Sequence, residues 1–162
     1  MTSDIVPNET ARLVPSPDGS SITFIAPFDG SNELWRIAVG DGAVERLTTG
    51  RQAIEAFDEA IGRDGRARWI WLRSSATELG DLWVRDGDGE PRRRTELNAE
   101  VFDEIELREP VERWVEVDGR RIQGWYLPPW PANRERRGGS PPPLVTEIHG
   151  GPPHPVRLGA GA

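Results

Sequence analysis

The amino-acid sequence predicts a mainly β protein in two parts, and three observations support that class. Gly (18 residues) and Pro (15 residues) are frequent, which favours many turns over long helices. Short apolar runs separated by Asp-Gly pairs recur with a period of about 47 residues in the first part of the chain. A further hairpin pattern, centred on Asp118-Gly119, follows in the second part. Short antiparallel strands are therefore expected throughout.

Two stretches, residues 13–50 and 57–98, repeat the same landmarks in the same order. The landmarks are an Asp-Gly turn, a Leu-Trp pair and an Arg-x-Thr motif or its variant. They occur as Asp18-Gly19 and Asp64-Gly65, as Leu34-Trp35 and Leu82-Trp83, and as Arg46-Leu47-Thr48 and Arg93-Arg94-Thr95. Because three separate landmarks agree, one structural unit is expected to occur twice.

Each repeat is predicted to hold three short strands. The first strand follows the Asp-Gly turn and is rich in β-favouring residues, the second contains the Leu-Trp pair, and the third ends in Arg-x-Thr. Tight turns of Gly and Asp join the second strand to the third. The first two strands are expected at residues 21–26 and 33–39 in one unit, and at 68–72 and 81–85 in the other.

Repeated antiparallel units of this length are typical of β-propeller blades. We therefore interpret residues 1–107 as a partial β-propeller of about two blades. Two successive hairpins of an unrelated β-sandwich are the alternative. A closed propeller has roughly four to eight blades, so two blades would leave apolar faces for neighbours to cover.

Aromatic residues at equivalent positions are predicted to be packing ribs of these blades. Trp35 and Trp83 occupy the same place in the two repeats, and Trp69 and Trp71 lie in an expected strand. An aromatic platform for a ligand is the alternative interpretation. The equivalence of the two Leu-Trp pairs favours packing.

The acidic turn after the second Leu-Trp strand allows a metal-binding interpretation. Asp86, Asp88 and Glu90 alternate like the start of a calcium loop, but the later ligands of such a loop are missing. Asp and Gly are also the residues that a hairpin turn requires. With only His149 and His154 as further metal-binding candidates of the zinc type, no metal site is predicted.

A second region is expected at residues 108–162, because the repeat pattern ends after Asn98. Residues 101–107 alternate like a strand, and Pro110 marks the boundary. The further elements expected are a hairpin of residues 114–117 and 121–127, an exposed Pro-rich loop at 128–143, and a third strand at 144–148.

The turn His149-Gly150-Gly151, which the last of these strands enters, is the strongest pointer to chemistry. The α/β-hydrolases place such a turn beside their nucleophile, where a backbone N–H helps to hold an oxyanion. Residues 108–162 are therefore interpreted as the N-terminal part of an α/β-hydrolase domain. The sequence holds no Gly-x-Ser-x-Gly elbow, so this domain is expected to be truncated before its nucleophile.

Composition narrows the possible partners and compartments. The net charge is -7 and all 20 basic residues are Arg, scattered among 27 acidic residues, which argues against binding to nucleic acid or to anionic membranes. The chain has no Cys, and no stretch resembles a signal peptide or a membrane span. A cytoplasmic protein without a cofactor is the expectation.

Taken in order, the motifs resemble the prolyl oligopeptidase family of serine peptidases, especially its acylaminoacyl-peptidase and dipeptidyl-peptidase-like bacterial members. In that family, a propeller of similar repeats leads into an α/β-hydrolase domain. The matching motifs after the repeats are Thr95-Glu96-Leu97-Asn98, Asp118-Gly119, Gly124-Trp125-Tyr126-Leu127-Pro128-Pro129 and His149-Gly150-Gly151-Pro152. The resemblance covers most of the chain, and the sequence departs from the family after Pro152.

The resemblance implies a serine-type peptidase that hydrolyses short peptides, with the propeller as a filter over the active site. By the family's motif, the backbone N–H of Gly151 is one oxyanion donor, Gly150 shapes the turn and His149 orients the loop. The Ser, Asp and His of the triad follow the oxyanion strand in α/β-hydrolases, so none is assigned in this chain.

The expected state of this chain is therefore a truncated piece of a peptidase that is inactive alone. Its expected partner is a peptide substrate in the longer parent protein, and its oligomeric state is left open. Two alternatives stand beside this hypothesis. One is a non-catalytic β-propeller fragment for binding or scaffolding, and the other is an esterase-like α/β-hydrolase, which the upstream repeat disfavours.

Overall fold

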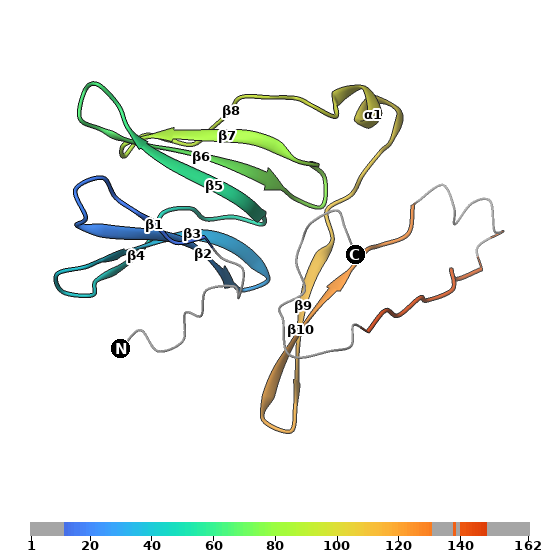
Figure 1. The fold of residues 1–162 in the computed structure, drawn as a ribbon. Coiled ribbons are helices and arrows are strands. Elements are labelled where there is room, and N and C mark those ends of the chain that lie inside the picture. Colours follow the sequence, from blue (N-terminus) through green and yellow to red (C-terminus); the bar gives the residue numbers. More distant parts are fainter. Residues whose placement is uncertain (1–11, 131–137, 139, 149–162) are drawn as a thin grey trace. The chain divides into compact units, whose positions relative to one another are not determined.

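The computed structural model describes residues 12–130, 138 and 140–148, which fall into two compact units that meet in sequence between Leu107 and Arg108. Both units are mainly β (Figure 1). The elements of the first unit are β1 (Val14–Pro15), β2 (Ser21–Phe28), β3 (Ser31–Ala38), β4 (Val44–Arg46), β5 (Ala53–Ile61), β6 (Ala67–Ser74), β7 (Asp81–Asp86), β8 (Arg92–Arg93) and α1 (Ala99–Glu104). Those of the second are β9 (Val111–Val117) and β10 (Arg120–Tyr126).

The eight strands of the first unit form one sheet that is made of two four-stranded antiparallel halves, each with its strands in chain order. We call β1–β4 the first meander and β5–β8 the second meander (Figure 1). One parallel pair, Asn32 with Ala53, joins β3 to β5. The predicted first and second strands of each repeat are confirmed within β2, β3, β6 and β7. The predicted third strands correspond to β4 and β8, which end at or beside the Arg-x-Thr motifs. The assignment of the meanders to propeller blades stays a prediction.

Strand β5 is an element that the repeat pattern did not reveal. Its apolar residues do not alternate regularly, because a β-bulge lies between Ile54 and Ala56 in the pairing with β6. A bulge shifts the register by one residue, so apolar side chains on both sides of it fall out of phase. The second repeat consequently begins at Ala53, ahead of the predicted start at Phe57.

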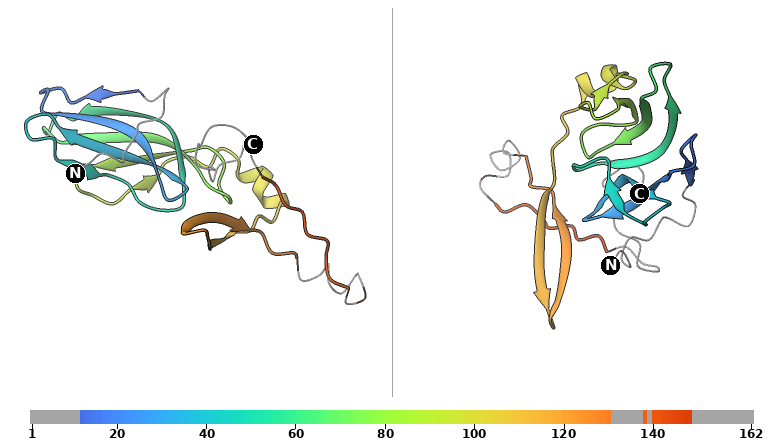
Figure 2. Two further views of the ribbon diagram at one scale, coloured as in Figure 1. Left: turned by 90° about the horizontal axis from the view of Figure 1, so that it is seen from below. Right: turned by 90° about the vertical axis from the view of Figure 1, so that its left-hand side faces the viewer.

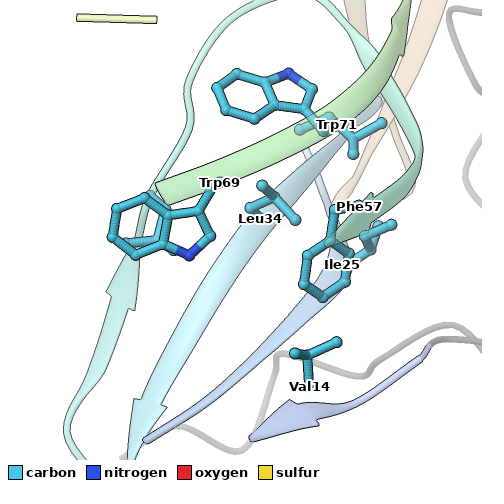
Figure 3. Packing of buried hydrophobic residues seen from close by; sticks show 8 residues of the cluster. Val14, Ile25, Leu34, Phe57, Trp69 and Trp71 are labelled. Atoms are coloured by element: carbon cyan, nitrogen blue, oxygen red, sulfur yellow. The ribbon is translucent and has the colours of Figure 1, made fainter. Parts of the chain in front are cut away.

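The main core lies between the two meanders, where each contributes one apolar face. Leu34 of the first meander lies close to Trp69 and Trp71 of the second (Figure 3). The full set of buried core residues is Val14, Ile25, Leu34, Leu47, Ile54, Phe57, Trp69 and Trp71. Trp69 and Trp71 are therefore packing residues, as the sequence predicted, and their burial fixes how the two meanders stack.

A smaller apolar cluster lies on the opposite face of the first meander. Phe24, Ala26 and Trp35 are buried there and pack against Ile37 and Val44. These side chains alternate with those of the main core along β2 and β3, because neighbouring residues of a strand point to opposite faces. We call this face the outer face of the first meander.

Two hairpins have two-residue turns whose residues both take positive φ angles. The turn between β2 and β3 is Asp29 (φ 45°) and Gly30 (φ 77°), and that between β9 and β10 is Asp118 (φ 50°) and Gly119 (φ 73°). Asp and Gly tolerate this left-handed backbone, which matches the twist of the flanking strands. The predicted Asp-Gly hairpin in the second unit is thereby confirmed.

The strand predicted at residues 101–107 is wrong, because the chain forms the short helix α1 from Ala99 to Glu104 instead. The backbone N–H of Phe102 donates to the carbonyl of Asn98 and closes the first helical turn. An alternating pattern of six or seven residues becomes a strand only beside a pairing partner. No residue of α1 is buried.

The second unit is built on one twisted two-stranded ribbon, β9 and β10 (Figure 2). Its register runs from Val117 opposite Arg120 to Val111 opposite Tyr126. The third strand predicted at residues 144–148 is wrong for this structure: the segment forms no strand, and Val145 is 86% exposed. Its apolar character alone does not fix a strand when no neighbouring strand pairs with it.

Candidate functional site

The three residues predicted to form part of an oxyanion hole are His149, Gly150 and Gly151, and all of them lie outside the described residues. The role predicted for each therefore stays a prediction. His154 also lies outside the described range. The polar groups that the structure brings together are in the first unit, at equivalent positions of its two meanders.

A buried carboxylate precedes the Leu-Trp pair in the first meander. Glu33 is 1% exposed, and its Oε2 accepts hydrogen bonds from Thr48 Oγ1 (2.5 Å) and Gln52 Nε2 (2.7 Å). Thr48 Oγ1 in turn accepts the backbone N–H of Leu34 at 2.9 Å. The Thr48 hydroxyl of the Arg-x-Thr motif thus links the side chain of Glu33 to the backbone of Leu34.

The same arrangement recurs in the second meander around Asp81, which is fully buried. Thr95 Oγ1 donates to Asp81 Oδ1 (2.7 Å) and accepts the N–H of Leu82 (2.9 Å). Asp81 also accepts the N–H of Leu97 at 3.0 Å and pairs with Arg93, whose Nε and Nη2 lie 3.0 and 2.5 Å from Oδ2. The repeat therefore encodes a polar clamp that ties the third strand of each meander to the segment after the fourth.

The two carboxyl groups differ in their pKa. Burial raises the pKa of Glu33 above its ordinary value, and the hydrogen bonds from Thr48 and Gln52 only partly oppose this effect. Burial acts in the same direction on Asp81, but the hydrogen bonds from Leu97, Thr95 and Arg93 outweigh it and lower the pKa. Asp81 is therefore the better-stabilised anion of the two.

The arginine of the Arg-x-Thr motif contributes to this difference, after the hydrogen bonds from Leu97 and Thr95. Arg93 forms an ion pair with Asp81, whereas Arg46 lies over the rings of Phe28 (4.2 Å) and Trp35 (5.8 Å). The guanidinium of Arg46 therefore acts on Glu33 only through longer-range attraction. Sequence reasoning identified both Arg-x-Thr motifs but missed the acidic residue before each Leu-Trp pair, although that residue repeats equally clearly.

A polar cavity of about 270 Å³ lies between the two meanders, next to the Glu33 clamp. Thr48 and Gln52, the two partners of Glu33, line it from the first meander and its link to β5. Trp71, Arg73 and Arg85 line it from the second meander. Arg85 Nη1 also donates to the carbonyl of Leu47 at 2.6 Å, which bridges the two meanders across the cavity.

The acidic turn between β7 and β8 does not gather ligands for a cation in the described structure. Asp86 accepts hydrogen bonds from Arg68 Nε (2.8 Å) and Arg92 Nη2 (2.7 Å), so its carboxylate is engaged by arginine. Within the described ranges, no group of three or more His, Cys, Asp or Glu residues is placed to hold a metal ion.

The fold is similar to that of solved acylaminoacyl peptidases. An orthorhombic crystal form of the Pyrococcus horikoshii enzyme matches with a TM-score of 0.52 and 27% identity, over 65% of this chain and 16% of that one. The uncomplexed enzyme from the same organism matches with a TM-score of 0.55 and 23% identity, over 72% of this chain and 18% of that one.

A third match is an acylaminoacyl peptidase in complex with Z-Gly-Gly-Phe-chloromethyl ketone, with a TM-score of 0.53 and 24% identity over 73% of this chain and 18% of that one. The chain thus spans less than a fifth of the length of these peptidases. No protein-family model matches the chain, and no curated protein matches it. Among the helices of the described part, none has the length and apolarity needed to cross a membrane.

Proposed function

We propose that this chain is part of a serine peptidase of the prolyl oligopeptidase family, which hydrolyses short peptides. The similarity to an acylaminoacyl peptidase at 27% identity is the observation that carries the proposal. The order of the sequence motifs supports it independently. In this proposal the two meanders are the last blades of a β-propeller, and residues 108–162 begin the α/β-hydrolase domain.

The proposed catalytic contribution of this chain is one half of an oxyanion hole. The backbone N–H of Gly151 would stabilise the tetrahedral intermediate, with Gly150 shaping the turn and His149 orienting it. The nucleophile, its general base and the orienting carboxylate would come from the remainder of a longer protein, because the printed sequence has no Gly-x-Ser-x-Gly elbow. The proposed location is the cytoplasm, and the proposed partner is a peptide.

The 162-residue chain should therefore not hydrolyse N-acetyl-alanine p-nitroanilide, and a serine-directed fluorophosphonate should not label it. The same assay tests the esterase alternative when p-nitrophenyl butyrate is added as an ester substrate. If either substrate is hydrolysed and the fluorophosphonate abolishes this activity, the chain carries its own nucleophile. That result would contradict the proposal that the nucleophile comes from the remainder of a longer protein.

The role proposed for Gly151 is tested in a protein extended through the reading frame downstream of the chain. Gly151→Pro removes the N–H donor, and kcat is expected to fall by about 100-fold or more. Gly151→Ala retains the N–H and is the matched control, with a smaller expected loss. Equal loss in the two variants would contradict a role for this N–H as the donor.

A further inference from the structure

The second meander has an apolar face that lies opposite the main core. The tryptophans of β6 point into the core, so Ile70 and Leu72 between and beyond them point the other way. Across the ladder, Ile70 pairs with Val84 of β7, and Leu72 pairs with Leu82. We call the side that carries these four residues the far face of the second meander.

The repeat shows that the far face has the pattern of a packing surface. Its Leu72–Leu82 pair is equivalent to the Ile25–Leu34 pair of the first meander, which lies in the main core. On the far face, however, both leucines are only half-buried and Ile70 is 41% exposed. A hollow of about 400 Å³ lies there beside Ile70. A face of this kind is suited to association with another surface.

Two opposite charges beside the hollow are weakly paired within one copy of the chain. Asp58 of β5 lies 3.4 Å from Arg12, and both side chains are more than half exposed, so this pair contributes little. Arg94, just after β8, is exposed and forms no ion pair within the described part of the chain. Asp58 and Arg94 approach the hollow from opposite edges of the meander. The other charged residues that line the hollow have partners in the same copy: Glu59, Arg68 and Asp86.

We propose that the far face binds the far face of a second copy of this chain. The two-fold axis would run along the strands, between the central strands β6 and β7 (Figure 1). Such an axis places Ile70 of one copy opposite Val84 of the other, and it turns the β5 edge of one copy toward the β8 edge of its partner. Asp58 of each copy then faces Arg94 of the other, so the two weakly paired charges are matched twice.

Head-to-tail stacking onto the first meander is disfavoured by the packing of its outer face. Trp35 on that face is 7% exposed. The ring of Phe28 lies 5.9 Å from the ring of Trp35, and the guanidinium of Arg46 lies 5.8 Å from it. The aromatic surface that would receive a far face is therefore already covered within its own copy, which leaves the symmetric contact.

The size of the far face supports a weak dimer. Four strands spaced about 4.8 Å apart, with about five residues each, span roughly 20 by 17 Å, and two such surfaces bury on the order of 1,000 Å² in total. That area is at the low end for specific interfaces, so a Kd of roughly 10–100 µM is expected.

The first test is sedimentation equilibrium of the full 162-residue chain at concentrations below and above this Kd. The parent chain is expected to form dimers. Ile70→Asp places a charge at the centre of the contact and should weaken the dimer by about 100-fold or more. Phe28→Ser removes a similarly exposed apolar side chain from the first meander, and it should leave this dimer intact.

Charge reversals test the symmetry of the contact. Asp58→Arg and Arg94→Asp each place like charges opposite one another twice, so each should weaken the dimer by about tenfold or more. A mixture of the two variants should form a heterodimer, because opposite charges then face each other at both places, and native mass spectrometry identifies it by mass. Asp103→Arg makes the same change of net charge on α1 and should leave the dimer unchanged. All three changes are at exposed residues, so they test the proposal even if Ile70→Asp fails to fold.

Four outcomes would overturn the far-face dimer. They are a parent chain that stays monomeric above the expected Kd, an Ile70→Asp chain that dimerises like the parent, loss of the dimer in Phe28→Ser, and a mixture of the charge-reversed variants that forms no heterodimer. None of these measurements depends on hydrolysis. The proposed peptidase function would therefore stand if the dimer failed, and the dimer would stand if the peptidase function failed.

Discussion

At the scale of single residues, each meander depends on one buried carboxylate and one threonine hydroxyl. Thr48 and Thr95 each donate to the carboxylate and accept the next backbone N–H, so two polar groups are satisfied at once. Buried polar groups stabilise a fold only when they are bonded in this way. The Arg-x-Thr motif and the acid before Leu-Trp are thus parts of one structural device.

Loss of the Asp81 carboxylate should destabilise the first unit. Asp81→Ala leaves the Thr95 hydroxyl and the Leu97 N–H without their acceptor and Arg93 without its partner. The expected loss is about 2 kcal/mol or more of unfolding free energy, measured by urea denaturation at neutral pH. Asp103→Ala, an exposed change in α1, is the control and should cost much less.

The same variant has an expected pH signature. The pKa of Asp81 is lowered below the ordinary 3.8, so its ionised form stabilises the fold above that pH. This contribution is lost as pH falls through the lowered pKa. The stability difference between the parent chain and Asp81→Ala should shrink on acidification below about pH 4. A difference that is constant down to pH 2 would contradict the assigned shift.

Glu33 should behave in the opposite direction. Its pKa is raised above the ordinary 4.5 by burial, so the fold favours the protonated carboxyl. The stability that this provides is complete below pH 4.5 and is lost as pH rises through the raised pKa. Glu33→Gln mimics the protonated form, and its melting temperature relative to the parent chain should rise between acidic and neutral pH.

A matched control makes the Glu33 test specific. Glu100→Gln changes an exposed carboxyl in α1, and its melting temperature should follow that of the parent chain across the same pH range. A falling melting temperature of Glu33→Gln relative to the parent chain, as pH rises, would show that the buried carboxyl is better stabilised as an anion than the structure indicates.

At the scale of elements, the β9–β10 ribbon depends on the backbone of its turn. Gly119 has φ 73°, a conformation that costs a residue with a Cβ about 1–2 kcal/mol. Gly119→Ala should therefore speed amide hydrogen exchange in β9 and β10 by about fivefold or more. Gly124→Ala is the control, because a Cβ there would lie 4.0 Å from the carbonyl of Arg113, an ordinary contact.

The elements that sequence predicts best are those in which turn chemistry and apolar pattern agree. The Asp118-Gly119 hairpin and the Leu-Trp strands satisfy both criteria and are confirmed. The bulge in β5 breaks the alternation, so pattern alone misses that strand. Residues 101–107 alternate and residues 144–148 are apolar, but neither segment has a neighbouring strand. Whether a neighbouring strand is present depends on the tertiary fold, so the local sequence does not determine it.

At the scale of the whole molecule, equivalent faces of the two meanders have different surroundings. Phe24 and Trp35 are paired on the outer face of the first meander, and the equivalent Trp71 and Trp83 of the second meander face the main core. The outer face therefore has the composition of a packing surface. Phe28, at its edge, is 41% exposed.

Self-association of the isolated chain is expected from the exposed apolar side chains of the first meander, Phe28 among them. Sedimentation velocity at increasing concentration should show growing assemblies, and Phe28→Ser should reduce them. Val101→Ser, which replaces a similarly exposed residue on α1, should not. A chain that stays monomeric at every concentration and melts reversibly in one sharp transition would contradict this prediction.

Candidate functional residues could be predicted from the sequence only where they form a contiguous motif. The His149-Gly150-Gly151 turn is a contiguous motif, although it lies outside the described residues. The polar cavity between the meanders could not be predicted, because it depends on the register that places Arg73 and Arg85 on the same face as Trp71. Neither arginine belongs to a landmark of the repeat.

Activity of the extended protein is the decisive test of the proposed serine peptidase function. The DNA that follows the codon for residue 162 is read onward, and the longer product is assayed with N-acetyl-alanine p-nitroanilide. We expect a Gly-x-Ser-x-Gly elbow followed by Asp and His, with hydrolysis that is lost when the elbow Ser is replaced by Ala. A product with no such elbow, or hydrolysis that survives the substitution, would contradict the assignment to a serine peptidase.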